Sequence, residues 1–283
     1  MKKENRLFAA IVILLVLILG ISYAYGKYYF PNAKSYSAYL EIFQEFESNE
    51  IIFISIDSIN HSVEIKPSNN EKIKVSYYQK VDNSNTFKLD QKVLTMEFIE
   101  KVENFDPLLF KPDKNINVIT IYLPQDITID INVKTIIGSF TINDVSARNI
   151  NFNNITGDFM MNNVGCNSIV LSCNTGDVKI MSTTFNRFNG SIVSGNFDFT
   201  LVDSFDNYKF EVSTTYGQLK LNNDYVYETN VVNEIETVEK SNSLISNNSK
   251  EGITFILNTL RGNISINTTE VKENIEENTE ANQ

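Results

Sequence analysis

From residue 51 onwards, hydrophobic and polar residues alternate with a spacing of two, which predicts β-strands with one face turned inward. Between residues 126 and 267 the alternation is tied to a recurring glycine. The first three intervals between these glycines are 19 residues each, the fourth is 22, and the last is 45, about two periods. A fixed period near 20 residues is typical of a solenoid. The glycines are Gly138, Gly157, Gly176, Gly195, Gly217 and Gly262.

Apolar residues also recur at fixed distances from each glycine. Those two and four residues after it are Phe140, Phe159, Val178, Phe197, Leu219 and Ile264, then Ile142, Met161, Ile180, Phe199, Leu221 and Ile266. A second apolar alternation lies five and seven residues before each glycine, with Gly190 as its exception. Because the inward positions repeat with the period, the coils should stack on one another. We predict an all-β, parallel β-solenoid with one strand on each face and about 19 to 22 residues per coil.

The residues around each glycine suit the corner of a coil. Glycine adopts a positive φ without a Cβ clash. The residue after it is small or polar and compatible with a turn: Ser139, Asp158, Asp177, Asn196, Gln218 and Asn263. Five residues after the glycine, an asparagine recurs and predicts a partial asparagine ladder at the next corner: Asn143, Asn162, Asn222 and Asn267.

The repeat divides the region 51–267, the predicted ectodomain, into four parts. Residues 51–125 contain strand-like segments but no glycine, and we expect irregular coils that cap the solenoid. Residues 126–222 form the regular coils, 223–251 an insertion loop that interrupts the period, and 252–267 the last coil. The polar, acidic residues 268–283 are expected to be a disordered tail.

The N-terminus predicts a membrane anchor. Residues 7–25 carry no charge and, as a helix, would nearly span a bilayer core of about 30 Å. Lys2, Lys3 and Arg6 precede this segment, so residues 1–6 should be cytoplasmic, 7–26 a transmembrane helix and everything after it extracellular. Residues 27–50 would be a juxtamembrane linker with a short helix. The alternative is a signal peptide cleaved near Ala24 and Gly26.

Two parts of this pattern resemble a known family. The strand "ITIYLP" leads into "ITIDINVKTIIGSFTINDV", and stacked T/S-G-D units follow behind a single apolar N-terminal segment. In these features residues 51–266 resemble the putative adhesin family of bacterial envelope proteins, a domain of unknown function. The resemblance implies a membrane-anchored β-solenoid with a surface role. Some members are similar to accessory membrane proteins encoded beside regulators of envelope stress.

The net charge, the two cysteines and the single histidine limit the ligands and the chemistry that we expect. The chain of 283 residues has a formal net charge of -11, which disfavours nucleic acid and anionic lipid headgroups as ligands. An extended strand would hold the Cα atoms of Cys166 and Cys173 roughly 20 Å apart, well beyond the ~7 Å limit for a disulfide. We therefore expect free thiols. His61, the only histidine, is expected to be a surface or turn residue.

Asp158 and Asp177 are the strongest candidates for chemistry. One period apart, they would lie about 5 Å from each other on adjacent coils, as a calcium site or a pair of catalytic carboxylates requires. The column continues with uncharged residues, however, which favours a structural corner over either site. There is no Cys/His cluster for zinc and no phosphate-binding glycine loop. We therefore expect no catalytic, cofactor or metal site.

These observations favour a non-enzymatic, membrane-anchored cell-surface protein that acts as an adhesin or an envelope scaffold. One alternative is an accessory regulatory protein of an envelope-stress response. Another is a polysaccharide-active β-solenoid enzyme. The expected partners are the membrane, through the single-pass anchor, and cell-envelope polymers or a membrane protein, but not nucleic acid. The expected location is the cell membrane, with the C-terminal domain outside.

Overall fold

The computed structural model of the chain describes residues 39–80, 85–98, 116–232, 235–245 and 252–269. Apart from Tyr39, all of these belong to one compact unit. The predicted transmembrane helix at 7–26 and almost all of the acidic tail lie outside the described residues. Within the described ranges, no helix is long and apolar enough to span a membrane.

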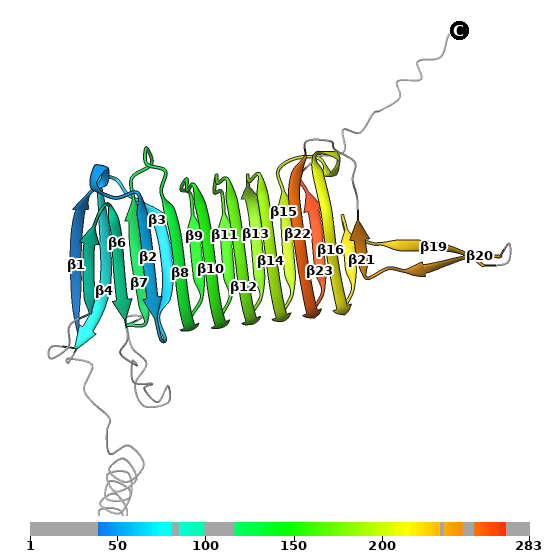
Figure 1. The fold of residues 1–283 in the computed structure, drawn as a ribbon, viewed down its shortest axis with the longest axis horizontal. Coiled ribbons are helices and arrows are strands. Elements are labelled where there is room, and N and C mark those ends of the chain that lie inside the picture. Colours follow the sequence, from blue (N-terminus) through cyan, green and yellow to red (C-terminus); the bar gives the residue numbers. More distant parts are fainter. Residues whose placement is uncertain (1–38, 81–84, 99–115, 233–234, 246–251, 270–283) are drawn as a thin grey trace, which may run out of the picture. The chain divides into compact units, whose positions relative to one another are not determined.

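Two large sheets and one hairpin make up the described part of the chain (Figure 1). The 11-stranded sheet runs, from edge to edge, β1 (Tyr39–Glu47), β4 (Lys72–Lys80), β7 (Val118–Leu123), β3 (Ser62–Pro67), β9 (Phe140–Asn143), β11 (Phe159–Asn162), β13 (Val178–Thr183), β15 (Phe197–Leu201), β23 (Ile264–Thr268), β17 (Leu219–Leu221) and β18 (Asp224–Tyr225). The 10-stranded sheet runs β21 (Ser243–Ile245), β16 (Tyr208–Tyr216), β22 (Ile253–Arg261), β14 (Arg187–Ser194), β12 (Ser168–Thr175), β10 (Asn149–Thr156), β8 (Asp130–Ile137), β2 (Phe53–Ser58), β6 (Val93–Phe98) and β5 (Thr86–Asp90). The hairpin consists of β19 (Tyr227–Val232) and β20 (Ile235–Lys240), and two short 3-10 helices are η2 (Ser48–Glu50) and η3 (Phe205–Asn207).

The repeat of 19 residues is the register of the parallel ladders. Ile150 in β10 pairs with Ile131 in β8 and with Ile169 in β12, one period away on either side. In the second sheet, Phe159 pairs in the same way with Phe140 and Val178. Each coil therefore contributes one strand to each sheet. The fold class is all-β with parallel sheets, as the sequence predicted.

The side chains that point between the two sheets form one continuous hydrophobic core. The apolar residues before each glycine enter the core from the 10-stranded sheet, and those after it enter from the 11-stranded sheet. Phe152 of β10 therefore packs against Phe140 and Phe159, whose ring centroids lie 5.4 and 5.6 Å from its own. Aromatic rings fill the next part of the stack, where Phe188 lies 5.0 Å from both Phe199 and Phe255. Because each inward position stacks on its equivalent in the next coil, the core extends along the whole ladder.

Gly190 is the exception in the inward columns, and the structure explains it. A Cβ built on Gly190 would lie 2.7 Å from Cε1 of Phe188 and 3.1 Å from Cδ1 of Leu257. The ring of Phe188 therefore occupies the volume that the side chain at position 190 fills in the other coils. The missing apolar residue leaves no gap in this coil.

We expect Gly190→Ala to destabilise the protein by about 1–2 kcal/mol, because the added methyl group overpacks a filled core. Thermal or denaturant unfolding would measure this change. The exposed neighbour Ser191 provides a control, since Ser191→Ala should change the free energy of unfolding by less than about 0.5 kcal/mol. A stabilising Gly190→Ala substitution would show that the site has unfilled space.

The order of coils in the stack differs from their order in the chain. The last coil in sequence, formed by β22 and β23, lies between the coil of β14 and β15 and the coil of β16 and β17. At the other end, β2 and β3 lie between the coil of β8 and β9 and the later strands β6 and β7. At each end of the stack, two coils are therefore exchanged relative to their order in the chain.

The structure corrects one prediction about an irregular region and adds detail to another. The second half of the expected juxtamembrane linker is not helical but forms strand β1, beside β4 at the edge of the 11-stranded sheet. The contacts across this edge include an ion pair between Lys72 and Glu47 and the ammonium of Lys74 over the ring of Phe43, so pairing with the sheet outweighs local helix propensity. The insertion at 223–251, expected as a protruding loop or a partly ordered segment, contains β18, the hairpin of β19 and β20, and β21.

Candidate functional site

The six repeat glycines lie above one another along one corner of the stack. A Cβ on Gly157 would overlap the carbonyl oxygen of Gly138, and a Cβ on Gly176 would overlap that of Gly157. The same relation continues to Gly195, Gly262 and Gly217, in the order of the stack rather than of the chain. Successive coils therefore touch through the backbone at this corner, and only a hydrogen on Cα fits. We call this column the glycine corner.

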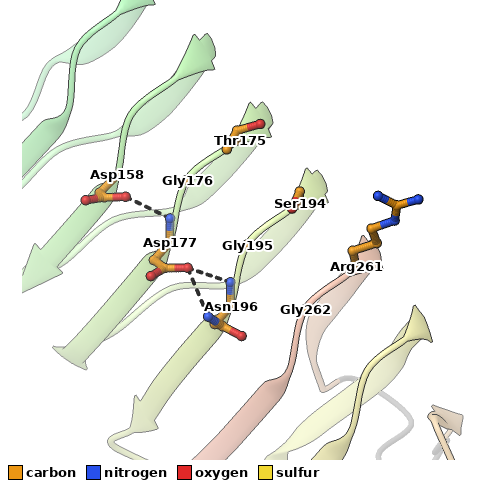
Figure 2. A pocket seen from close by; sticks show the side chains of 9 residues that line it. All are labelled: Asp158, Thr175, Gly176, Asp177, Ser194, Gly195, Asn196, Arg261 and Gly262. Carbon is orange, nitrogen blue, oxygen red and sulfur yellow. Dashed lines mark hydrogen bonds between the residues drawn. The ribbon is translucent and has the colours of Figure 1, made fainter.

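The candidate carboxylates Asp158 and Asp177 lie beside the glycine corner and bind the backbone of the neighbouring coil. Oδ1 of Asp158 accepts a hydrogen bond of 2.8 Å from the backbone N–H of Asp177. Oδ1 of Asp177 in turn accepts bonds of 2.7 and 3.2 Å from the backbone and side-chain amides of Asn196 (Figure 2). Each acid thus completes the backbone hydrogen bonding of the coil that follows it.

The same bond recurs along the column with different side chains. Ser62 accepts it from the N–H of Ser139, Ser139 from Asp158, Asn196 from Asn263, and Asn263 from Gln218, at 3.0 or 3.1 Å. The position therefore requires a short side chain with an acceptor oxygen, which serine, aspartate and asparagine all provide. A negative charge is not part of this requirement.

We expect Asp177→Ala to lower the free energy of unfolding by about 1 kcal/mol, because the amides of Asn196 lose their acceptor at an exposed position. Asp177→Asn keeps the acceptor oxygen and should leave stability unchanged. Chemical denaturation of both variants would separate the two effects. If asparagine were as costly as alanine, the charge rather than the hydrogen bond would matter at this corner.

A shallow groove of about 480 Å³ follows the glycine corner. Its lining residues come from four neighbouring coils: Asp158, Thr175, Gly176, Asp177, Ser194, Gly195, Asn196, Arg261 and Gly262 (Figure 2). Within the described ranges, no group of three or more His, Cys, Asp or Glu side chains is arranged to hold a metal ion. The groove is thus walled by the polar ladder and by backbone, and its carboxylates are already engaged by amides.

A second column, polar in all coils but that of Ile192, faces the core three residues before each glycine, and it was not among the expected features. Oγ1 of Thr214 donates to the carbonyl of Gly262 at 2.8 Å, and Nδ2 of the buried Asn154 lies 3.2 Å from the carbonyls of both Gly138 and Gly157. These groups satisfy carbonyl oxygens that face inward at the corner. The sequence does contain a signal for this column, because the position three residues before each glycine continues the inward alternation of the apolar columns. Its residues are Thr135, Asn154, Cys173, Ile192, Thr259 and Thr214.

A second corner, with left-handed backbone, lies at the far end of the strand that follows each glycine. Asp144, Asn163 and Ser182 occupy equivalent positions in three successive coils with φ of 55°, 52° and 48°. Nδ2 of Asn163 donates to Oδ1 of Asp144 at 2.8 Å. The polar ladder at this corner therefore lies one residue beyond the predicted asparagine column, at positions where aspartate and asparagine tolerate a positive φ.

His61 lies in the turn between β2 and β3, one of the two expected positions, but it is buried rather than at the surface. Its side chain is 2% exposed, lies 5.3 Å from the ring of Phe98, and places Nδ1 3.1 Å from the hydroxyl of Ser58. The same residue occupies the glycine position of its coil, and a Cβ on Gly138 would overlap its carbonyl oxygen. Burial lowers the pKa of the imidazole to about 4, so the ring is neutral at pH 7.

Both cysteines are free thiols, as the strand between them predicted. Cys173 is buried in the inner polar column, where its Sγ lies 3.6 Å from the carbonyl of Gly157. Burial raises the pKa of Cys166 to about 12, and it also raises the pKa of Cys173. Because the thiolate is the reactive form, neither residue is a nucleophile at neutral pH.

The outward side of the 10-stranded sheet has a different character from the corner. Over β10, β12, β14 and β22, three outward positions per strand form columns across four coils, which we call the neutral face: Asn151, Asn153, Ile155, Val170, Ser172, Asn174, Asn189, Ser191, Val193, Ile256, Asn258 and Leu260. None of these side chains is charged. Charge resumes at three borders of this face: at Lys134 and Glu211 on the flanking strands, and at the exposed Arg187, the preceding outward position of β14.

A family model described as Toastrack DUF4097 matches residues 51–282. The chain is similar to a putative cell adhesion protein from Clostridium sporogenes, with 14% identity and a TM-score of 0.43 over 81% of this chain and 99% of that one. It is also similar to a putative adhesin from Bacteroides fragilis, with 13% identity and a TM-score of 0.41 over 81% and 97%. No curated protein matched.

The family model extends over most of the chain and includes all six repeat glycines. It confirms the resemblance to the putative adhesins that the repeat and the "ITIYLP" strand indicated. The chain belongs to the Toastrack DUF4097 family.

Proposed function

We propose that the protein is a non-enzymatic, membrane-anchored cell-surface protein whose solenoid presents an adhesive face. The neutral face is the observation that carries this proposal. The chain has a net charge of -11, and charged residues make up 21% of it, yet twelve outward positions over four adjacent coils carry no charge. A protein that needed only solubility would have no reason to exclude charge from one continuous surface.

The candidate carboxylates support a non-enzymatic role. Oδ1 of both Asp158 and Asp177 is bonded to backbone amides of the next coil, and serine or asparagine replaces them elsewhere in the column. A catalytic acid or base must exchange protons with substrate, whereas these side chains hold the coils together. The uncharged segment from Leu7 to Tyr25, preceded by three basic residues, supports the membrane anchor and the outward orientation of the solenoid.

The proposal is tested by producing the full chain with a C-terminal tag in a non-adherent bacterium. Protease added to intact cells should remove the tag, and cells with the chain should attach to envelope- or matrix-coated surfaces more than cells without it. A protected tag would contradict the orientation, and equal attachment would contradict adhesion. Cleavage of a cell-wall polymer by the purified full chain, abolished by Asp158→Asn or Asp177→Asn, would identify an enzyme instead.

A further inference from the structure

We propose that the neutral face binds a neutral, hydroxyl-rich polysaccharide. This inference rests on the proposed adhesive function and adds the chemical class of the ligand. Three features of the face lead to it: a row of amide and hydroxyl side chains, an adjacent row of exposed aliphatic side chains, and the absence of charge.

The middle column of the neutral face is wholly polar and uncharged. Asn153, Ser172, Ser191 and Asn258 follow one another in register across β10, β12, β14 and β22, and all four are exposed. With coils about 4.8 Å apart, the row extends over about 14 Å. Amide and hydroxyl groups both donate and accept hydrogen bonds, as sugar hydroxyls do, so each position of the row can bond a hydroxyl in either direction.

Most of these polar groups are not engaged by the protein itself. Within the described part of the chain, Asn258 accepts a bond from Ser213 and Asn151 donates one to Asn132. The structure shows no side-chain hydrogen bond for five members of the face in the same ranges: Asn153, Ser172, Asn174, Asn189 and Ser191. Their donors and acceptors point to solvent and are available to a ligand. This distinguishes them from the corner side chains, which bind the next coil.

The column beside the polar row is largely aliphatic. Ile155, Val193 and Leu260 are 50%, 48% and 42% exposed, and Asn174 is the one amide among them. Sugar rings present apolar C–H faces next to hydroxyl groups, so a polar row beside an apolar row matches both parts of a polysaccharide chain. A small-molecule pocket would be concave, whereas this surface is open and repeats along the stack, which suits a polymer.

Charge and composition disfavour the other occupants. An anionic polymer would be repelled by the net charge of -11; the twelve positions of the face include no basic side chain, and Arg187 and Lys134 lie only at its borders. A cationic partner would find no carboxylate on it. A protein partner, including a second copy of this chain, would bury the free amides and hydroxyls without an aromatic anchor and with Arg187 only at the border of the face.

The test uses the full chain in detergent and a panel of soluble polysaccharides on a biosensor. The neutral probes are dextran, a β-glucan, a mannan and a galactan, and the anionic probes are polygalacturonate and hyaluronan. We expect at least one neutral polysaccharide to bind and neither anionic one. Binding of an anionic polymer with equal affinity, or concentration-dependent self-association through the face without glycan binding, would overturn the inference.

Matched variants locate the binding surface. Ser172→Glu with Ser191→Glu places two charges at paired positions of the neutral face, and we expect at least a tenfold loss of affinity. Thr141→Glu with Met160→Glu does the same at paired outward positions of β9 and β11 in the other sheet, and binding should be unchanged. Ser172→Asn with Ser191→Asn keeps uncharged hydrogen-bonding groups and should bind within about threefold of the unaltered protein. Equal losses in both glutamate pairs would overturn the assignment to this face.

The two proposals fail in different ways. If cells with the chain adhere to a protein-coated surface but the purified chain binds no neutral polysaccharide, the ligand class is wrong and the adhesive function stands. If the cells adhere to no surface and the purified chain binds no polymer, both proposals are wrong.

Discussion

Replacing Gly157 by alanine is expected to lower the free energy of unfolding by about 3 kcal/mol or more. The backbone at Gly157 has φ of +148°, and a Cβ there would overlap the carbonyl of Gly138. A strained φ costs of order 1–3 kcal/mol and forced overpacking about as much again. For a domain of this size the melting temperature should fall by roughly 6–12 °C. Thermal unfolding followed by circular dichroism would measure the shift.

Gly165 is the matched control for this experiment. It lies in the same part of the stack, but a Cβ there would make only ordinary contacts, at 3.6 Å from Oγ1 of Thr184 and 3.7 Å from Oγ of Ser146. Gly165→Ala should therefore be tolerated. Equal melting temperatures for the two variants would show that the glycine corner is not a point of backbone contact. Because each coil contacts only its neighbours, hydrogen exchange in Gly157→Ala should increase first in β8 to β12.

Lowering the pH from 6.5 to 4 is expected to cost about 3 kcal/mol of stability through His61 alone. The unfolded imidazole takes up a proton near pH 6.5, whereas burial lowers the pKa of the folded one to about 4. Stability from the neutral ring is therefore complete above pH 6.5 and is lost as the pH falls toward 4, at about 1.4 kcal/mol per pKa unit. Urea denaturation at half-unit pH steps would measure this dependence.

The control for the pH dependence is His61→Gln. Since His61 is the only histidine, no other side chain has an ordinary pKa between pH 5 and 6.5. In the variant the free energy of unfolding should be nearly constant over that interval, whatever its absolute value. A variant with the same slope as the unaltered protein would assign the pH dependence to other groups and contradict the burial of a neutral ring.

The regular part of the fold was predictable because its determinants are local and periodic. The interval of 19 residues is the ladder register itself, so equivalent residues such as Ile131, Ile150 and Ile169 pair directly. The column that begins at Ser139 was predicted to be a polar corner. The sequence did not reveal why: each oxygen accepts from the N–H of the next coil, which depends on the distance between coils.

The features that escaped prediction depend on contacts between distant segments. No local signal places β22 and β23 between β14–β15 and β16–β17, because that order is decided by which sheet edges bury one another. The turn position of His61 could be expected from the sequence, but its burial could not, because it depends on Phe98 packing against it from a neighbouring coil. Strand β1 looked helical because its partner β4 begins 25 residues later.

The neutral face could not be predicted from the sequence, although the inward columns behind it could. The inward columns stood out through their hydrophobicity, whereas the outward ones mix asparagine, serine and aliphatic residues without an obvious period. Their common property is the absence of charge, which becomes a surface feature only when β22 is placed next to β14. Without that placement, residues 256–260 would not extend the face of β10, β12 and β14.

The most direct test of the account is adhesion of cells that display the full chain with altered outward faces. Ser172→Glu with Ser191→Glu and Thr141→Glu with Met160→Glu add the same charge to opposite sheets, and both sets should reach the surface in equal amounts. We predict that the first pair abolishes attachment and that the second leaves it unchanged. Equal attachment by both variants and the unaltered protein would contradict the claim that the stack exists to present its neutral face.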